Sequence, residues 1–403
     1  MSLEGTFGRR RRTPRRWGEG VDRIGGEAIS SRMARRAPLR HLDPSLLLVT
    51  VLLSVFGTLM VSSTTGTQGF TGFYANVFMK HQLIYLIVAA FGLIGMILFD
   101  YRHLRGLAPV IYGGTILALV LVISPLGTLQ LGARRWIDLG PFQIQPSELA
   151  KLAAIVCAGA YLSLRKGDVL WRDIGLVIGM VVLPMVLIYA EPDLGTMMVF
   201  VALTGALLLV GGAKIRHFLV IAVIAGVGIF GVLQMGLLHQ YQIDRLTAFL
   251  HPNPDVQSVG YNLTQSKIAI GSGGIRGKGL EQKNTQTALD FVPSQHTDFI
   301  FTAVGEQLGF VGAATLFALF AFLIWRALRI AALSRDLFGT LIATGIAALW
   351  AFQMFVNIGM TMGIMPITGI PLPFISYGGS SLVTNYLAVG LLLNVHMRRY
   401  LSP

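Results

Sequence analysis

The sequence has 403 residues, of which 54% are hydrophobic and 13% charged, and its net charge is +13. Its mean hydropathy is +0.66. So much apolar surface cannot be hidden in one soluble core, so the composition excludes a soluble globular domain and predicts an all-α polytopic membrane protein. The single cysteine, Cys157, excludes an intrachain disulfide, and scattered histidines without a HExxH motif argue against a zinc site.

The N-terminal tail, residues 1–44, carries eleven arginines against five acidic residues, with Gly and Pro between them. This composition predicts a disordered cytoplasmic tail, separate from a membrane domain that covers residues 45–403. Its basic run could touch anionic headgroups or nucleic acid. Setting the membrane topology is the simpler role, and we expect no nucleic-acid partner.

Ten apolar runs are long enough to cross a membrane, and an even number places both ends of the chain on one side. The side of the N-terminal tail holds 23 of the 32 Lys and Arg residues, which predicts cytoplasmic termini in a bacterial inner membrane. The runs cover residues 45–63, 81–99, 107–125, 147–164, 174–190, 194–211, 217–237, 299–325, 338–363 and 377–397.

This orientation places residues 238–298, between the seventh and eighth helices, outside the cell as one large extracytoplasmic loop. A connection of this length is usually functional or disordered. It contains an amphipathic piece, residues 261–270, that would lie on or dip into the outer face of the membrane.

A glycine-rich turn, Gly271–Gly279, follows that piece. It is not a nucleotide-binding P-loop, because Ser272 stands where the first glycine is needed and Gly279 where Ser or Thr is needed. Glycines allow close approach of the backbone, and Arg276 and Lys278 supply positive charge that suits a pyrophosphate. A flexible turn with solvated cations remains an equally good interpretation.

The fourth span begins with a cluster of charges. Arg134 and Arg135 lie just outside it, and Glu148 and Lys151 are three residues apart and therefore on one face of the helix. An ordinary ion pair at a helix start is the alternative, but Lys151 lies about 5 Å below that start. We favour a polar cavity lined by these groups.

Two further outer segments carry polar residues. Glu191 and Asp193 flank Pro192 between two spans that are joined almost without a loop. These acids could neutralise the helix dipole, pair with Lys151 or Arg135, or hold a divalent cation, and we rank pairing first. The last outer connection, GIPLPFISYGGSS, includes Ser376 and has prolines and glycines where helices would break at membrane depth.

Asp298 lies where the long outer loop meets the eighth helix. A carboxylate at such a boundary is a functional hypothesis by default, because burying its charge is costly. The alternative is a simple helix cap, since Asp is common at helix N-termini. The local sequence alone leaves both interpretations open.

Five motifs in order identify a resemblance: RRWIDLGPFQIQPSELAK, EPDLGT, QSKIAIGSGGIRGKG, HTDFIF with GEQLGF, and PLPFISYGGSS. Together they resemble the shape, elongation, division and sporulation (SEDS) family, and the resemblance covers all but the tail. QSKIAIGSGG with the following GKG and NTQ-x-x-LDF is more similar to the elongation branch (RodA-like) than to the division branch (FtsW-like).

The resemblance implies a peptidoglycan glycosyltransferase that polymerises lipid II with a class B penicillin-binding transpeptidase and other elongation-complex membrane proteins. The proposed catalytic aspartate of the family corresponds to Asp298, its cavity acid and lysine to Glu148 and Lys151, and its EPDLGT acid to Asp193. Family members usually have Pro-Glu where this chain has Pro293-Ser294, so this chain departs from the family pattern and has no carboxylate at position 294.

The chemistry fits these residues. Asp298 would remove a proton from the acceptor sugar hydroxyl, and nearby cations would stabilise the departing pyrophosphate. The available cations are Arg134, Arg135, Lys151, Lys267, Arg276 and Lys278, with room for a divalent ion, Mg²⁺ or Mn²⁺. Two other classes stay open: a lipid-precursor flippase or transporter that uses the same charges without chemistry, and a scaffold that only recruits a partner helix.

Overall fold

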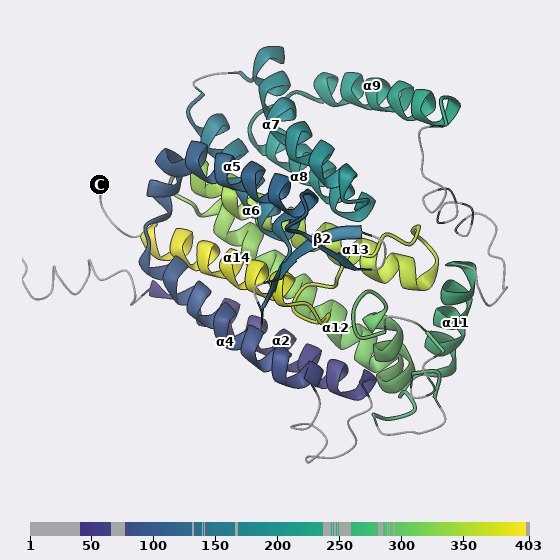
Figure 1. The fold of residues 1–403 in the computed structure, drawn as a ribbon. Helices are drawn as coiled ribbons and strands as arrows, with labels where there is room; N and C mark the ends of the chain where they lie inside the picture. The colour runs from purple at the N-terminus through teal and green to yellow at the C-terminus, as the bar shows by residue number, and fades with distance from the viewer. Residues whose placement is uncertain are drawn as a thin grey trace, which may run out of the picture.

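The computed structural model describes residues 41–65, 77–130, 133–138, 140, 142–165, 168–236, 259–280, 285–287, 291–292 and 295–399, together with residues 243, 245, 247, 249 and 289. The described residues form a bundle of helices with three short strands (Figure 1). In chain order the elements are α2 (Pro44–Thr64), α4 (Val77–Leu98), α5 (Tyr101–Ile123), β1 (Thr128–Gln130), β2 (Ala133–Asp138), β3 (Gln143–Ile144), α6 (Pro146–Ser163), α7 (Trp171–Ala190), α8 (Leu194–Val210), α9 (Ile215–Gln234), α11 (Val259–Ser272), α12 (Ile300–Ala332), α13 (Leu337–Met362) and α14 (Gly379–Arg398).

Each of the ten predicted apolar runs is a helix in the structure. By length and composition, six of these helices could cross a membrane: α2, α4, α5, α7, α12 and α13. The helices α8 and α9 also contain apolar helical stretches, which are shorter. The predicted tail, except residues 41–44, and much of the connection 238–298 lie outside the described residues.

The remaining two helices, α6 and α14, are surrounded by other helices. The helix α6 contacts α5, α7, α8, α13 and α14, and α14 contacts α2, α4, α6, α12 and α13. Most side chains of both helices are buried. A helix that is enclosed by protein can carry polar groups that lipid would not tolerate, which explains why these two are less apolar than their neighbours.

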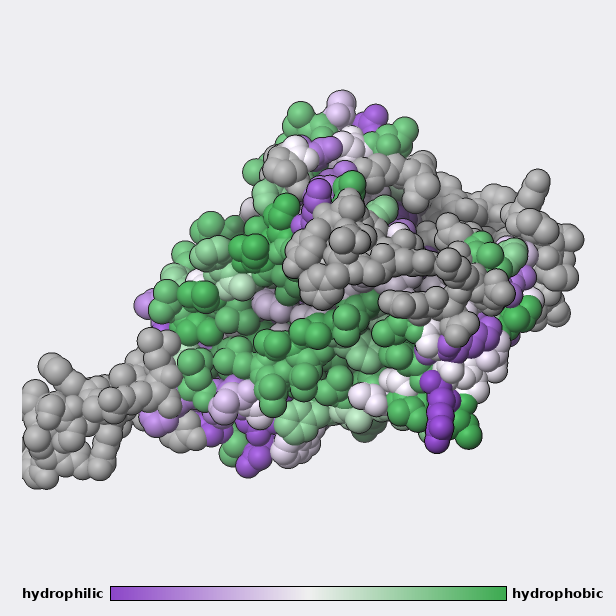
Figure 2. Space-filling view, turned by 90° about the horizontal axis from the view of Figure 1, so that it is seen from below, coloured by the Kyte–Doolittle hydropathy of each residue, from purple (hydrophilic) through white to green (hydrophobic). Residues whose placement is uncertain are grey.

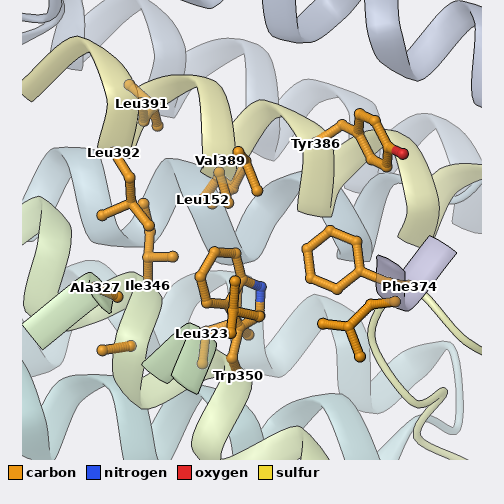
Figure 3. Packing of buried hydrophobic residues seen from close by; sticks show 14 of the residues in the cluster. Leu152, Leu323, Ala327, Ile346, Trp350, Phe374, Tyr386, Val389, Leu391 and Leu392 are labelled. Carbon is orange, nitrogen blue, oxygen red and sulfur yellow. The ribbon is translucent and has the colours of Figure 1, made fainter. Parts of the chain in front are cut away.

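The core continues from the helices into the last connection, residues 363–378. The Trp350 ring lies 5.6 Å from the ring of Phe374, which lies 6.0 Å from that of Tyr386. Figure 3 shows these three rings together between α13 and α14. The Trp350 ring is also held by a polar contact, because its Nε1 donates to Asn385 Oδ1 at 2.7 Å. This packing fixes the connection on which part of the site is built.

The outer faces of α2 and α4 are apolar. Figure 2 shows a broad hydrophobic area across the middle of one side of the molecule, with hydrophilic residues toward its ends. Exposed large apolar side chains on these two helices include Leu48, Val51, Leu52, Val55, Leu59, Ile84, Ile87, Phe91 and Ile94. Such a surface is expected where helices face lipid instead of water.

The all-α expectation is wrong in one segment, residues 126–146. There, β2 pairs antiparallel with both β1 and β3, with Thr128 opposite Trp136 and Ile137 opposite Ile144. Because successive side chains of a strand point to opposite faces, Arg134 and Arg135 are directed differently. Arg134 is exposed, whereas Arg135 is partly buried.

The helix α12 is broken near its start, at Gly309, whose φ is 62°. The glycine-rich turn after α11 contacts this break. Lys278 N and Gly279 N donate to the carbonyls of Glu306 and Gln307, at 3.0 and 2.9 Å. In return, Phe310 N and Val311 N donate to the carbonyls of Gly274 and Ile275, at 2.9 and 3.1 Å. The backbone groups that the break releases are therefore paired.

Candidate functional site

A cavity of about 510 Å³ lies among β2, the starts of α6 and α8, the turn before α12, and the last connection. We call it the Asp298 cavity. It is lined by Tyr85, Ala133, Arg135, Trp136, Gln143, Gln145, Glu148, Asp193, Thr196, Arg245, His296, Thr297, Asp298, Gly369, Pro371, Tyr377, Gly378, Gly379, Ser380 and Ser381. Its volume falls in the range of small-molecule sites, and its lining mixes aromatic, hydroxyl and charged groups.

Asp298 lies in this lining, in the turn that precedes α12. It is not the cap of that helix: the N-cap position is occupied by Phe299, and no side-chain capping bond is made there. Burial of the carboxyl raises its pKa to about 6, and the negative charge of Asp193 adds to the rise, while Arg245 and Arg135 oppose it. The structure therefore favours the functional interpretation of Asp298 over the helix cap.

The turn that carries Asp298 is held by its backbone. Asn357 Nδ2 donates to the carbonyls of Asp298 and Ile370, at 2.9 and 2.7 Å. Ser376 Oγ donates to the Thr297 carbonyl at 2.6 Å and accepts from Leu372 N at 2.8 Å. Ser376 thus links the turn to the last connection through hydrogen bonds. It does not line the cavity. These bonds leave the Asp298 carboxylate on a fixed backbone.

Glu148 and Lys151 form a buried pair in the first turns of α6. Lys151 Nζ donates to Glu148 Oε1 at 2.6 Å, and the two side chains are 3% or less exposed. Glu148 lines the cavity, and Lys151 lies behind it. Pro146 suits the first turn of the helix, where no backbone donor is needed. The contact confirms that the two side chains share one face of the helix.

Arg135 binds main-chain oxygens. Its Nε donates to the Glu191 carbonyl at 2.8 Å, and its Nη2 donates to the Pro192 carbonyl. The Asp193 carboxylate caps α8 through Thr196 N and Thr196 Oγ1, at 3.0 and 2.9 Å. The predicted pairing of these acids with Arg135 was therefore wrong in its atoms, because the arginine uses the backbone of the turn.

Glu191 is fully buried, and both of its carboxylate oxygens lack a hydrogen-bond partner in the described part of the chain. Burial is the largest cause that raises its pKa, to about 8, followed by the charge of Asp193, while Arg135 opposes the rise. The carboxyl is therefore neutral near pH 7. A neutral acid beside Asp193 avoids two adjacent negative charges.

Five of the six predicted cations do not line the cavity: Lys151, which lies behind Glu148, and Arg134, Lys267, Arg276 and Lys278. Arg134 donates to the Ser124 carbonyl at 3.3 Å. Arg276 is exposed on the glycine-rich turn.

The other two pack against helices. Lys267 lies against Gly363, where a Cβ would be 2.6 Å from its Nζ. Lys278 Nζ pairs with Glu306 Oε1 at 2.9 Å. Glu306 is fully buried and also accepts from Gln286 N and from Thr287.

Arg245 is a cavity residue that the sequence did not reveal. It lines the Asp298 cavity, and its Nη1 donates to the Thr368 carbonyl at 3.2 Å. His296 and Tyr377 were also missed, although they lie in the motifs HTDFIF and PLPFISYGGSS. Their rings are 5.8 Å apart, and Tyr377 N donates to the His296 carbonyl at 2.8 Å. The motifs contained the signal for these two, whereas nothing local marked Arg245.

Within the described residues, no three His, Cys, Asp or Glu side chains are arranged to hold a metal ion. The fold and the cavity together define a multi-pass membrane protein with a charged site among the ends of its helices. Residues 44–401 match the FtsW/RodA/SpoVE family model, described as "Cell cycle protein", and the chain belongs to this family. The resemblance seen in the motifs is thereby confirmed.

Curated relatives match along nearly their whole length. The peptidoglycan glycosyltransferase MrdB of Escherichia coli K12 is 37% identical over 362 residues, which cover 89% of this chain and 94% of that protein. The stage V sporulation protein E of Bacillus subtilis is 37% identical over 357 residues, covering 88% and 96%. A probable peptidoglycan glycosyltransferase FtsW of Trichlorobacter lovleyi is 35% identical, covering 91% and 97%.

Solved structures show the same fold. A chain from a structure described as "Structural coordination of polymerization and crosslinking by a peptidoglycan synthase complex" aligns with a TM-score of 0.76 at 30% identity, covering 90% of this chain and 99% of that one. The rod shape determining protein RodA of Thermus thermophilus aligns with a TM-score of 0.66 at 29% identity, covering 90% and 98%.

Proposed function

We propose that this chain is a peptidoglycan glycosyltransferase that polymerises lipid II into glycan strands during cell elongation, with Asp298 as the general base. Relatives across both branches of the family carry the glycosyltransferase name. The observation that carries the residue assignment is the position of Asp298: it lines a cavity of substrate size and its pKa is about 6. A carboxyl with that pKa is ionised at pH 7 yet more basic than an ordinary aspartate.

The reaction needs a base for the acceptor hydroxyl and positive charge for the departing pyrophosphate. Asp298 supplies the first. Arg135 and Arg245 line the same cavity and replace the larger set of cations that the sequence suggested. Arg135 is held by two backbone carbonyls, so its charge is fixed in position before substrate binds.

The buried pair of Glu148 and Lys151 forms part of the same polar wall. We propose that Glu148 and Asp193, which both line the cavity, contact the polar part of the substrate. A divalent cation, Mg²⁺ or Mn²⁺, would enter with the pyrophosphate oxygens and stays a prediction.

We further propose that all ten long helices cross the membrane, with both termini in the cytoplasm and the cavity at the outer face. The enclosure of α6 and α14 by other helices supports this count, because an enclosed helix needs no apolar surface of its own. The excess of Lys and Arg on the side of the tail supports the orientation.

A class B penicillin-binding transpeptidase is the proposed partner, within a set of elongation-complex membrane proteins. One structural relative comes from a complex that coordinates polymerisation and crosslinking. The elongation role is supported by the RodA-like pattern NTQ-x-x-LDF in this chain and by the similarity to MrdB and to RodA.

The test is polymerisation of labelled lipid II by the purified full-length chain, with and without its partner. Asp298→Asn should reduce glycan-strand formation by about 100-fold or more, the size of effect expected when a positioned base is lost. Asp138→Asn is the matched control: Asp138 is an exposed carboxylate on β2, and an amide oxygen can still accept from Gly140 N. Full activity of the Asp298 variant refutes the assignment, and translocation of lipid II without polymer identifies a transporter.

A further inference from the structure

A second cavity, of about 90 Å³, lies at the end of α12 that is opposite to Asp298. It is formed by the last turns of α12 and the C-terminal end of α14. We call it the arginine pocket, and it is lined by Arg326, Arg329, Ile330, Leu333, His396 and Arg399. Three guanidinium groups from two helices thus line one small space, and no carboxylate is among the lining residues.

One of the three guanidinium groups is buried and only partly satisfied. The Arg326 side chain is 12% exposed and pairs with Asp43, the residue before α2. Its Nε is buried and has no hydrogen-bond partner among the described residues. A buried donor without an acceptor is costly and calls for an explanation, of which a bound anion is one.

Charge balance points in the same direction. Asp43 pairs with Arg326, and the residues that line the pocket include three arginines and no carboxylate. Cations near a helix C-terminus are favourable for the helix dipole, but that effect does not require them to converge. An anion that accepts from several guanidinium groups would relieve their mutual repulsion.

The surroundings of the pocket are apolar and exposed. Trp325, Leu328 and Leu333 are 47 to 49% exposed on the same part of α12. The guanidinium groups of Arg326 and Arg329 lie 5.6 and 5.4 Å from the centre of the Trp325 ring. Tryptophan beside arginine is typical of the boundary between hydrocarbon and headgroups. A ligand here would meet cations at one end and apolar side chains at the other.

We propose that the arginine pocket binds the phosphate group of an anionic phospholipid, with the acyl chains along the exposed apolar side of α12. Arginine binds phosphate oxygens through paired N–H groups, and basic pockets between membrane helices are suited to anionic headgroups. A pocket of this size admits one phosphate group and not a disaccharide. A soluble phosphate shares the anionic chemistry but would gain nothing from Trp325, Leu328 and Leu333.

The test compares lipid binding to the delipidated full-length chain in detergent, measured by native mass spectrometry. The probes are dioleoyl-phosphatidylglycerol, dioleoyl-phosphatidylcholine and inorganic phosphate. The variant Arg329→Gln/Arg399→Gln leaves the buried pair of Arg326 and Asp43 in place. At about 1 kcal/mol for each lost charge, phosphatidylglycerol should bind about 30-fold more weakly, with no change for phosphatidylcholine.

A double variant with the same loss of charge is the control. Arg105→Gln/Arg216→Gln removes two exposed arginines on α5 and α9, outside the pocket. Equal weakening in this control would mean that only overall charge matters and would overturn the proposal. Inorganic phosphate that binds as well as phosphatidylglycerol, or a pocket variant with unchanged lipid preference, would overturn it as well.

Folding of the variants is checked by thermal unfolding. If the glutamine variant does not fold, Arg329→Lys/Arg399→Lys replaces it, because lysine keeps the charge and loses the paired N–H geometry. It should bind phosphatidylglycerol more weakly than the native chain, and unchanged binding would overturn the proposal. The proposal does not depend on glycosyltransferase activity, so each can fail without the other.

Discussion

The raised pKa of Asp298 makes the pH dependence of polymerisation a direct test of its role. A general base works only when it is ionised, so activity must fall as the pH falls through its pKa. With a pKa of about 6, about 90% of the carboxyl is ionised at pH 7, about half at pH 6 and about 10% at pH 5. Below pH 6, kcat/KM should therefore decrease about tenfold per pH unit.

The neighbours of Asp298 allow the assignment to be separated from other acid effects. Asp193 raises its pKa and Arg245 lowers it. The fall in kcat/KM on the acid side of the pH–rate profile, here called the acid limb, should therefore move to lower pH in Asp193→Asn. It should move to higher pH in Arg245→Gln. The asparagine oxygen can still cap α8 through Thr196, so the first change need not disturb the helix.

The assay is the initial rate of glycan-strand formation from labelled lipid II, measured at several pH values for the native chain and both variants. Opposite displacements of the acid limb are expected. An unmoved limb, or displacement in the same direction in both variants, would show that another group limits the rate. Thermal unfolding is followed at each pH, and rates from any variant that unfolds in the acid range are left out.

Three further predictions concern stability. Lys151→Ala should lower the unfolding free energy by about 3 to 5 kcal/mol, because it leaves Glu148 buried without its partner. The double variant Lys151→Met/Glu148→Gln should recover part of the lost melting temperature. No recovery would contradict a direct coupling between Lys151 and Glu148. Glu191 has its pKa raised from 4.5 to about 8. The stability that its protonated form provides is fully present below about pH 4.5 and is lost as pH rises from there through about 8, so Glu191→Gln should flatten the fall in melting temperature across that range. Gly277→Ala places a Cβ 2.2 Å from the Gln307 carbonyl at a φ of 75° and should destabilise by about 1 to 3 kcal/mol or more, whereas Gly271→Ala, which meets nothing within 4 Å, should behave like the native chain.

Much of the fold was predictable because a membrane helix corresponds to a continuous apolar run in the local sequence. All ten apolar runs are helices, and several ends agree within a residue or two, as for α6 and α8. The reason is physical: the length of an apolar run reports how far the chain can pass through hydrocarbon. The small sheet was missed because the strands β1 and β3 are only three and two residues long. Strands this short carry no usable periodicity.

The site was predictable where one motif carried both the residue and its position. Glu148 and Lys151 lie on one face because three residues separate them, and spacing within a helix is local information. Arg245 and the contacts of Arg135 depend on segments that are far apart in the chain, so composition and spacing did not reveal them. For the same reason, the sequence did not reveal that Lys278 pairs away from the cavity, since its partner Glu306 lies on α12.

The contact of the glycine-rich turn with α12 explains why two separate motifs occur together in this chain. At Gly309 a Cβ would lie 2.3 Å from Gly277 N, so both segments need glycine to approach this closely. Glu306 then accepts from Lys278 and from Thr287 while fully buried, which ties the following loop to the same place. The start of α12 is thereby fixed by residues about 30 positions earlier in the chain. Asp298 lies two residues before that start, so the contact of the glycine-rich turn with α12 helps to fix the segment that carries Asp298.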